Sequence, residues 1–537
     1  MNTVNNIAAP VKKANRLQAT KLNNKMVTEY WEELFKAKEK GKLVCWYEGV
    51  AINPILQAAD IAWCHGEAAA ALLAARKEEG PAQKAAEEAG YDRELCSYAR
   101  THIGCGVLSQ RSTEEAKTLM LPEGEDARRG LAARIPLPDM IISAYPFCST
   151  GQQWDDMIYR TFGKRVPVFN ISLPWIWGNK PSAKYMSGPE YRESVDFLVL
   201  QLRECIKFIE GITGKPFDHD RLRDIMGYIK QAAELKVEAQ RLCRAKPSPA
   251  SFFEWTNSIA PVNFLPGGPE IVDYFVKKKA EIVDRIDKGI GSVPDEKYRL
   301  FWDGIMNWNK IGWLSDKFAG YDACMVAGRY THMGFWHETE VIDLRDPLDG
   351  MAQNYLTCPI SISAPQVIEK VIEHCEYYQI DGLVLHGART CRAFSYPQFL
   401  IADAVGKRLG MPVAMFEGDM VDESFYKDEL VNSRVEAMLE QIEARRQRNR
   451  FWSLATAHVA MESSNTMNRF ATLRLIMRFG SIGCPVFALL VGTGLCLMLW
   501  GSMTWLAVPL AVLAGGFAYL LARSYVEIIT IVMEMAH

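Results

Sequence analysis

The feature of this sequence that most constrains its fold is a unit of strand, cysteine-bearing turn, helix and strand that occurs twice. In the first copy the apolar run DMIISAY leads to Cys148, and the helix-like QQWDDMIYRTFG then precedes VPVFNIS. In the second copy QIDGLVLHG leads to Cys391, and YPQFLIADAVGKRLG precedes MPVAMFEGD. A strand, a helix and a second strand with short joints are typical of a parallel βαβ unit. Two copies predict two parallel α/β sheets.

The length of 537 residues agrees with several domains. We predict an α/β protein with two doubly wound parallel-sheet domains, added helices and a C-terminal apolar helical hairpin. In chain order, the predicted segments are an N-terminal helical segment (1–40), a first α/β domain (41–180), a helical region (181–297), a second α/β domain (298–430), a charged helix and linker (431–479) and the hairpin (480–537).

The composition excludes several classes of protein. The formal net charge is −3 and no long block of one sign occurs, so nucleic acid is not predicted as a partner. The N-terminus lacks the apolar core of a signal peptide and the 13 cysteines are an odd number, so a secreted, disulfide-stapled protein is not expected. No C-x-x-C motif occurs, and any metal site must therefore combine distant segments.

Cysteines follow the carboxyl ends of two predicted strands, where ligands bind in parallel α/β sheets. We therefore expect Cys148 and Cys391 to point into one cleft between the two domains. A third sulfur is expected from CSYARTHIG, in which Cys96 is the first candidate, with Cys105 and Cys64 as alternatives. Short donors and backbone N–H groups that could stabilise anionic sulfur are expected in the adjoining turns, at Ser149, Thr150, Gly151, Arg389 and Thr390.

Three motifs together resemble the 2-hydroxyacyl-CoA dehydratase and benzoyl-CoA reductase family. They are CSYARTHIG, the strand ending in FCSTG, and LVLHGARTCRAFSYPQ followed by GMPVAMFEGDMVD, and the resemblance runs from about Gly41 to Arg446. It implies two doubly wound α/β domains with a [4Fe–4S] cluster held between them by three cysteines. Matched by motif, the ligands are Cys96, Cys148 and Cys391, which leaves the fourth iron open to water or a substrate oxygen.

The resemblance also implies an activity, the transfer of one electron at very low potential into the thioester carbonyl of an acyl-CoA. The tryptophan-rich segments CWYEGVAINP, NISLPWIWGNKP and LFWDGIMNWNKIGW favour reduction of benzoyl-CoA or a related aromatic acyl-CoA, because indole rings suit a flat acyl group. Most of these tryptophans are nevertheless expected to be core or subunit interface. The alternatives are dehydration of a 2-hydroxyacyl-CoA and a non-catalytic subunit that anchors or shapes a complex.

The expected partners follow from the same resemblance. The sequence contains no G-x-x-x-x-G-K-[ST] motif. The resemblance therefore implies separate ATP-hydrolysing activator subunits, together with a related cluster-carrying subunit and a ferredoxin-type electron donor upstream.

Two residues are predicted to act in catalysis. His386 lies in the apolar run before the second cysteine and could donate a proton or a hydrogen bond to the thioester oxygen, with a purely structural hydrogen bond as the alternative. Glu48 follows the first predicted strand and could act as a proton donor; His65 and His102 are further candidates. The polar segment THMGFWHETE fits no helical zinc motif, and we interpret it as surface or interface.

Near the C-terminus, Ile482–Trp500 and Met503–Ala522 are almost uncharged apolar runs. Each is close to the ~20 residues that a helix needs to cross ~30 Å of hydrocarbon, which predicts a transmembrane hairpin. Arginines flank both runs, so we expect both ends on the cytoplasmic side, with residues 482–522 tethering a cytoplasmic protein to the inner membrane. A buried hairpin is the alternative, and the two-residue turn predicted at Gly501–Ser502 also allows a re-entrant one.

Overall fold

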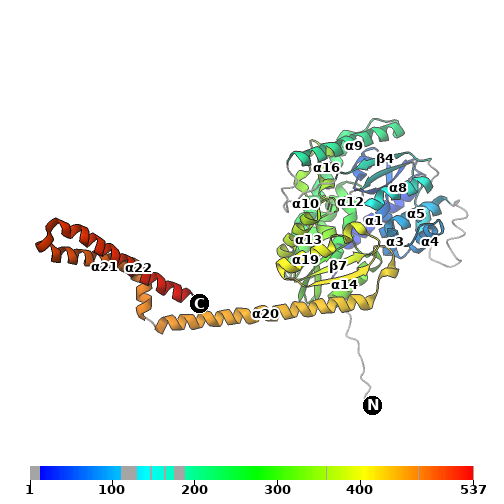
Figure 1. Cartoon of the computed structure of the whole chain (residues 1–537). Helices are drawn as coiled ribbons and strands as arrows, with labels where there is room; N and C mark the ends of the chain where they lie inside the picture. Colours follow the sequence, from blue (N-terminus) through cyan, green and yellow to red (C-terminus); the bar gives the residue numbers. More distant parts are fainter. Residues whose placement is uncertain are drawn as a thin grey trace, which may run out of the picture. The chain divides into compact units, whose positions relative to one another are not determined.

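The computed structural model describes residues 12–110, 130–145, 148–161, 165–174, 188–334, 336–358, 360–469 and 471–535. The chain separates into two compact units, Met1–Ile442 and Glu443–His537. The first unit contains all the strands and the second is helical (Figure 1). Because both sheets belong to one compact unit, the finer domain boundaries stay a prediction.

Two four-stranded parallel sheets form the centre of the first unit. One contains β1 (Val44–Gly49), β2 (Ala62–His65), β3 (Met140–Tyr145) and β4 (Val168–Ser172), in the order β2-β1-β3-β4. The other contains β5 (Tyr298–Asp303), β6 (Ala323–Gly328), β7 (Gly382–Ala388) and β8 (Val413–Gly418), in the order β6-β5-β7-β8. These matching orders confirm the predicted α/β class and agree with the internal repeat.

Each sheet reverses its strand order at its centre. The reversal falls between β1 and β3 in one sheet and between β5 and β7 in the other. Every pair is parallel, so the carboxyl ends of the two central strands lie at one edge of their sheet. This edge is the place where parallel α/β sheets bind ligands.

Helices cover both faces of the first sheet. Val44 and Trp46 of β1 belong to one apolar cluster with residues of α3 (Gly66–Arg76), α5 (Ser97–Gln110) and α8 (Ser149–Thr161). Cys45 and Tyr47 belong to another cluster with residues of α9 (Pro189–Thr213) and α10 (His219–Leu242). Since successive side chains of a strand alternate between faces, Glu48 falls on the face of α5.

Shorter helices complete the first unit. They are α1 (Ala19–Phe35), α2 (Asn53–Ala58), α4 (Gly80–Glu88), α7 (Leu131–Arg134), α11 (Phe252–Asn257), α12 (Ile259–Asn263), α13 (Pro269–Asp287), α14 (Ile311–Gly320), α15 (Arg329–His332), α16 (Pro347–Leu356), α17 (Ala364–Tyr377), α18 (Arg392–Ser395) and α19 (Gln398–Leu409).

The interpretation of THMGFWHETE as surface or interface was wrong for its first histidine. His332 is fully buried, and its ring meets those of Trp255 and Tyr378. The reason is that α15 directly follows the buried strand β6, so its side chains turn into the core.

The second unit is built from three long helices. The chain enters it along α20 (Asp428–Arg469) and continues as α21 (Ala471–Met503), a 3₁₀ turn at Thr504–Leu506 and α22 (Ala507–Met535). The turn is therefore three residues further along than predicted, because Gly501 and Ser502 continue α21 and Thr504 takes the positive φ of 46° that reverses the chain. By length and composition, the apolar stretch Ile482–Thr530 could cross a membrane.

Candidate active site

A cavity of about 100 Å³ lies where the central strands of both sheets end. It is lined by Gly49 at the end of β1, Cys148 after β3, Ile305 after β5 and Cys391 after β7. Cys96, directly before α5, lines the same cavity. The fold thus brings the three predicted thiols, from three remote segments, to one place.

Each of these cysteines directly precedes a helix. Cys96 stands before α5, Cys148 before α8 and Cys391 before the short α18. The burial of each sulfur raises its thiol pKa, to about 12 for Cys391. Backbone N–H groups in the first turn of the following helix act in the opposite direction and favour the thiolate. These groups belong to Ala99, Thr150, Gly151 and Phe394.

The donor set fits an iron–sulfur cluster better than a single ion. Among the described residues, no three His, Cys, Asp or Glu side chains are placed to hold one metal ion. In a [4Fe–4S] cube each thiolate binds a different iron, so its sulfurs stand further apart than the ligands of one ion. Buried thiols that stay protonated by themselves become thiolates when a metal binds them.

The alternative third ligands lie elsewhere. Cys64 on β2 and Cys105 on α5 are fully buried in the apolar core and do not line the cavity. A fourth cavity thiol, Cys358, was not predicted, because it follows α16 and no strand end marks it. Its pKa is raised by burial and by Glu67, while the three other cavity cysteines do not perturb it.

A carboxyl group that the sequence analysis missed also lines this cavity. Glu67 is the second residue of α3, immediately beyond the carboxyl end of β2. Burial raises the pKa of Glu67 to about 7, so its side chain is a weak acid beside the sulfurs. The segment HGE after a strand-like run was the signal that could have identified it.

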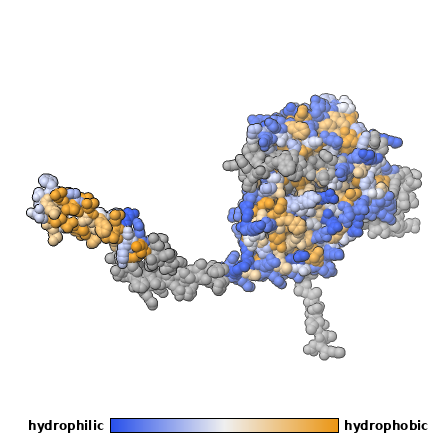
Figure 2. Space-filling view, viewed as in Figure 1, coloured by the Kyte–Doolittle hydropathy of each residue, from blue (hydrophilic) through white to orange (hydrophobic). Residues whose placement is uncertain are grey.

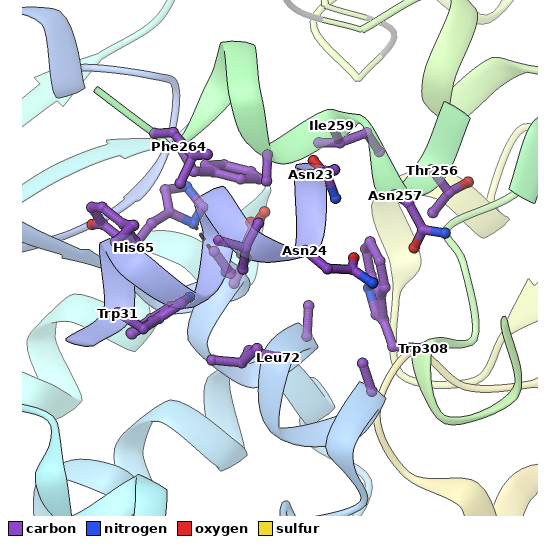
Figure 3. Close-up of a pocket in the computed structure, with 18 of the residues that line it drawn as sticks. Asn23, Asn24, Trp31, His65, Leu72, Thr256, Asn257, Ile259, Phe264 and Trp308 are labelled. Carbon is purple, nitrogen blue, oxygen red and sulfur yellow. Dashed lines mark hydrogen bonds between the residues drawn. The ribbon is translucent and has the colours of Figure 1, made fainter. Parts of the chain in front are cut away.

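A second cavity of about 160 Å³ adjoins the first and shares Glu67, Tyr98 and Tyr330 with it. In Figure 3, Trp31, His65 and Phe264 lie on one side of this space and Trp308 on the other. Asparagines 23, 24 and 257 supply polar groups. No described lysine or arginine lines either cavity, and burial lowers the pKa of His65 to about 3, which leaves it neutral.

The tryptophans divide between core and cavity. Trp46 and Trp302 are fully buried in the core, as expected for most of them. Trp154 lines the cavity of the three thiols, and Trp308 lines the adjoining one. The segment PWIWGNKP lies almost entirely outside the described residues.

Glu48 lies behind the cavity wall. Its Oε1 is 2.9 Å from Nδ1 of His102, and both side chains are fully buried. Asp155 lies close to them, and its pKa is raised by burial and by the Glu48 carboxylate. Gly66 is what admits this arrangement, since an added Cβ would lie 2.5 Å from His102 Nδ1 and 2.7 Å from Glu48 Oε1. Glu48 therefore lies directly beneath the backbone that presents Glu67.

His386 does not line the cavity either. Its ring is fully buried between Trp302 and Phe416 on β7, and burial lowers its pKa. Nδ1 lies 2.6 Å from the carbonyl oxygen of Ile305, so this nitrogen carries the hydrogen and donates it. Because Ile305 lines the cavity, His386 holds a segment of its wall.

Polar contacts hold the Cys96 segment against the second sheet. Arg100 is fully buried and its Nη2 donates to Oδ2 of Asp422 over 2.7 Å. Thr390 Oγ1 accepts a hydrogen bond from the backbone N–H of Ser97 over 3.0 Å and donates to Asp419 over 2.6 Å. The prediction that the Thr390 side chain donates toward sulfur was therefore wrong, because Asp419 takes its proton. Likewise, the Arg389 side chain pairs with Glu94 and Glu417.

This geometry can be compared with known proteins. The chain matches the model of the 2-hydroxyglutaryl-CoA dehydratase D-component family over residues 51–442. The chain belongs to this family. The match confirms the resemblance seen in the motifs and covers all three cavity cysteines and nearly all of both sheets.

Its relatives include reductase and dehydratase subunits. A benzoyl-CoA reductase subunit of Thauera aromatica is 28% identical over 443 residues, which are 80% of this chain and 95% of that protein. The (R)-2-hydroxyisocaproyl-CoA dehydratase alpha subunit of Clostridioides difficile is 26% identical, with 80% and 97% covered. The alpha subunit of (R)-2-hydroxyglutaryl-CoA dehydratase of Acidaminococcus fermentans is 23% identical, with 78% and 96% covered.

Proposed function

We propose that this chain is the cluster-binding subunit of a radical acyl-CoA reductase that reduces benzoyl-CoA or a related aromatic acyl-CoA in an ATP-driven one-electron step. The observation that carries the proposal is the convergence of Cys96, Cys148 and Cys391 on one cavity beside an aromatic-lined one. These three residues would hold the [4Fe–4S] cluster, which supplies single electrons at low potential when bound.

The acyl group would enter the aromatic-lined cavity. Its volume of about 160 Å³ is sufficient for a six-membered ring, since an apolar protein cavity of about 150 Å³ binds benzene. Neither cavity has a described cation that could pair with a second carboxylate on the substrate. Burying such a carboxylate without a partner is costly, which supports an uncharged acyl group over a glutaryl-type one.

Protons would be supplied by Glu67, which lines both cavities and whose pKa of about 7 suits a donor near neutral pH. The two residues predicted from the sequence would act through others. Glu48, paired with His102, would support the backbone of Gly66 and Glu67. His386 would hold Ile305 in the cavity wall.

Dehydration of a 2-hydroxyacyl-CoA is the second candidate function, favoured by relatives that are named dehydratase subunits. The two reactions differ in their demand for electrons, because a reductase consumes electrons in every turnover and a dehydratase needs them only to start. Oxidised donor is therefore measured against product formed, with the chain in its complex. Consumption that grows in proportion to product supports the reductase, and a fixed starting amount refutes it.

The remaining alternative is a non-catalytic subunit. Replacing Cys96, Cys148 and Cys391 together by Ala should abolish turnover of the complex. Unchanged turnover would favour a purely structural role.

The relatives are named as subunits, which supports partner chains for this protein as well. We propose a related cluster-carrying subunit, ATP-hydrolysing activator subunits and a ferredoxin-type donor upstream. The complex would work in the cytoplasm, tethered to the cytoplasmic face of the inner membrane by residues 482–522.

A further inference from the structure

We propose that α21 and α22 form a hairpin that crosses the lipid bilayer completely, with its turn exposed on the side opposite to its two ends. The proposal concerns Glu443–His537, which lie outside the residues that match the family. It stands independently of the chemistry proposed above.

The outer surface of the hairpin is apolar on all sides. Large side chains such as Leu497, Met498 and Trp505 are 80%, 83% and 79% exposed. The apolar colour extends along the hairpin in Figure 2. Contiguous apolar surface of this extent is rare on soluble proteins and marks an interface with protein or lipid.

The seam between the two helices identifies lipid as the medium. An added Cβ on Gly492 would lie 3.1 Å from the carbonyl oxygen of Ala511, and one on Gly515 would lie 3.0 Å from that of Ala488. Small residues recur at every fourth position along the seam. They are Gly480, Cys484, Ala488 and Gly492 on α21, and Ala507, Ala511 and Gly515 on α22.

This seam is the reverse of a hairpin that is stable in water. A soluble hairpin places its large apolar side chains between the helices, because burying them stabilises the pair. In lipid this gain is absent, and small residues that let the backbones approach closely are favoured instead. Here the small residues face inward and the leucines face outward, as a bilayer requires.

The length and the ends of the helices agree with a full crossing. No Asp, Glu, Lys or Arg occurs from Ser481 to Ala522. At 1.5 Å per residue, about 20 residues on each side of the turn cover ~30 Å of hydrocarbon. Trp500 and Trp505 lie beside the turn with ring centroids 6.0 Å apart, as in the aromatic belts of membrane interfaces.

The charges are at the opposite end of the hairpin from the turn. Arg523 follows the second apolar run and pairs with Glu527 over 3.1 Å. Arg474 and Arg478 precede the first run. The uncharged turn is the part that can be translocated, while the arginines keep both ends in the cytoplasm.

The first test measures integration of the full-length chain. Membranes of expressing bacteria are extracted with alkaline carbonate, which releases proteins that are only bound to the surface. We expect the chain in the pellet. A chain released into the supernatant would overturn the proposal, whether the hairpin is then covered by another protein or by a second copy.

Leu490→Arg with Leu513→Arg tests the lipid-facing surface. Both leucines are exposed, at 65% and 70%, on adjacent helices. Each arginine at bilayer depth should disfavour insertion by about 100-fold, so the double variant should leave the pellet. Leu200→Arg, at a leucine that is 56% exposed on α9, is the matched control and should pellet like the parent chain. Equal pelleting of the double variant and the control would contradict the proposal.

Ser502→Cys tests whether the hairpin crosses or re-enters the membrane. Intact spheroplasts are treated with a membrane-impermeant maleimide, which cannot reach the cytoplasmic cysteines of the chain. A crossing hairpin predicts labelling of the variant and no labelling of the parent chain. A variant that pellets with the membrane but stays unlabelled would refute the crossing.

Discussion

Replacing Arg100 by Met should loosen the segment that carries Cys96. The Arg100 side chain is fully buried and donates to Asp422, whose side chain is 10% exposed, and to the half-exposed Glu87. Removing one partner of a buried pair costs about 3–5 kcal/mol, because the other charge is left without compensation. We take the lower end, about 3 kcal/mol, since Asp422 keeps a hydrogen bond from the backbone N–H of Ser424.

The loss should depend on pH in a defined direction. Burial raises the pKa of Asp422, but hydrogen bonds from Ser424 and Arg100 outweigh burial and leave the pKa below its usual value. A lowered carboxyl pKa stabilises the fold above the unfolded value of about 4, and this contribution disappears as the pH falls through the folded pKa. The effect of Arg100→Met should therefore be full at pH 7 and shrink in acid.

Hydrogen–deuterium exchange of α5, followed by mass spectrometry, measures this change locally. A loss of about 3 kcal/mol corresponds to roughly 100-fold faster exchange of amides that open with the segment. Arg93→Met is the matched control, because Arg93 reaches the same carboxylate over 3.4 Å from a half-exposed position. It should change exchange by less than about 1 kcal/mol. Equal effects of the two variants would refute the role assigned to the buried pair.

Four further predictions concern the cavity and the tail. Thr390→Val removes the acceptor of the Ser97 N–H and should cost about 1–3 kcal/mol, measured by the same exchange experiment. Gly66→Ala should lower the thermal midpoint by overpacking worth about 1–3 kcal/mol, whereas Gly211→Ala, where the added Cβ meets no atom within 4 Å, should not. Turnover should fall as the pH rises through about 7, where Glu67 loses its proton, and Glu67→Gln should abolish this limb of the pH profile. A chain that ends at Arg450 should keep its turnover while leaving the membrane.

Patterns local to the chain predicted much of the fold and part of the site. The alternation of apolar runs and helices identified both sheets, because parallel strands are continuous apolar runs wherever they are buried on both faces. Cys148 and Cys391 were identified because strand ends in such sheets share one edge. The motif around Cys96 then selected it over Cys105, which lies further along the same segment and faces the core.

What depended on contacts between distant segments could not be predicted in this way. Glu67 and Cys358 reach the cavity only because α3 and the segment after α16 come together there. The burial of His386 behind Ile305 depends on the pairing of β5 with β7 and on the cover by Trp302 and Phe416. Nothing in the local sequence distinguishes a strand-end histidine that faces a cavity from one that faces the core.

The central claim is that three remote cysteines hold one iron–sulfur cluster, and iron and sulfide analysis with EPR of the anaerobically purified, reduced protein tests it most directly. The account predicts about four irons and four sulfides per chain, as a [4Fe–4S] cluster requires, with a cluster signal that is lost in Cys391→Ala. Cys358→Ala, at a thiol of the same cavity, should keep the signal. A signal that survives Cys391→Ala, or one that disappears only with Cys358→Ala, would contradict the account.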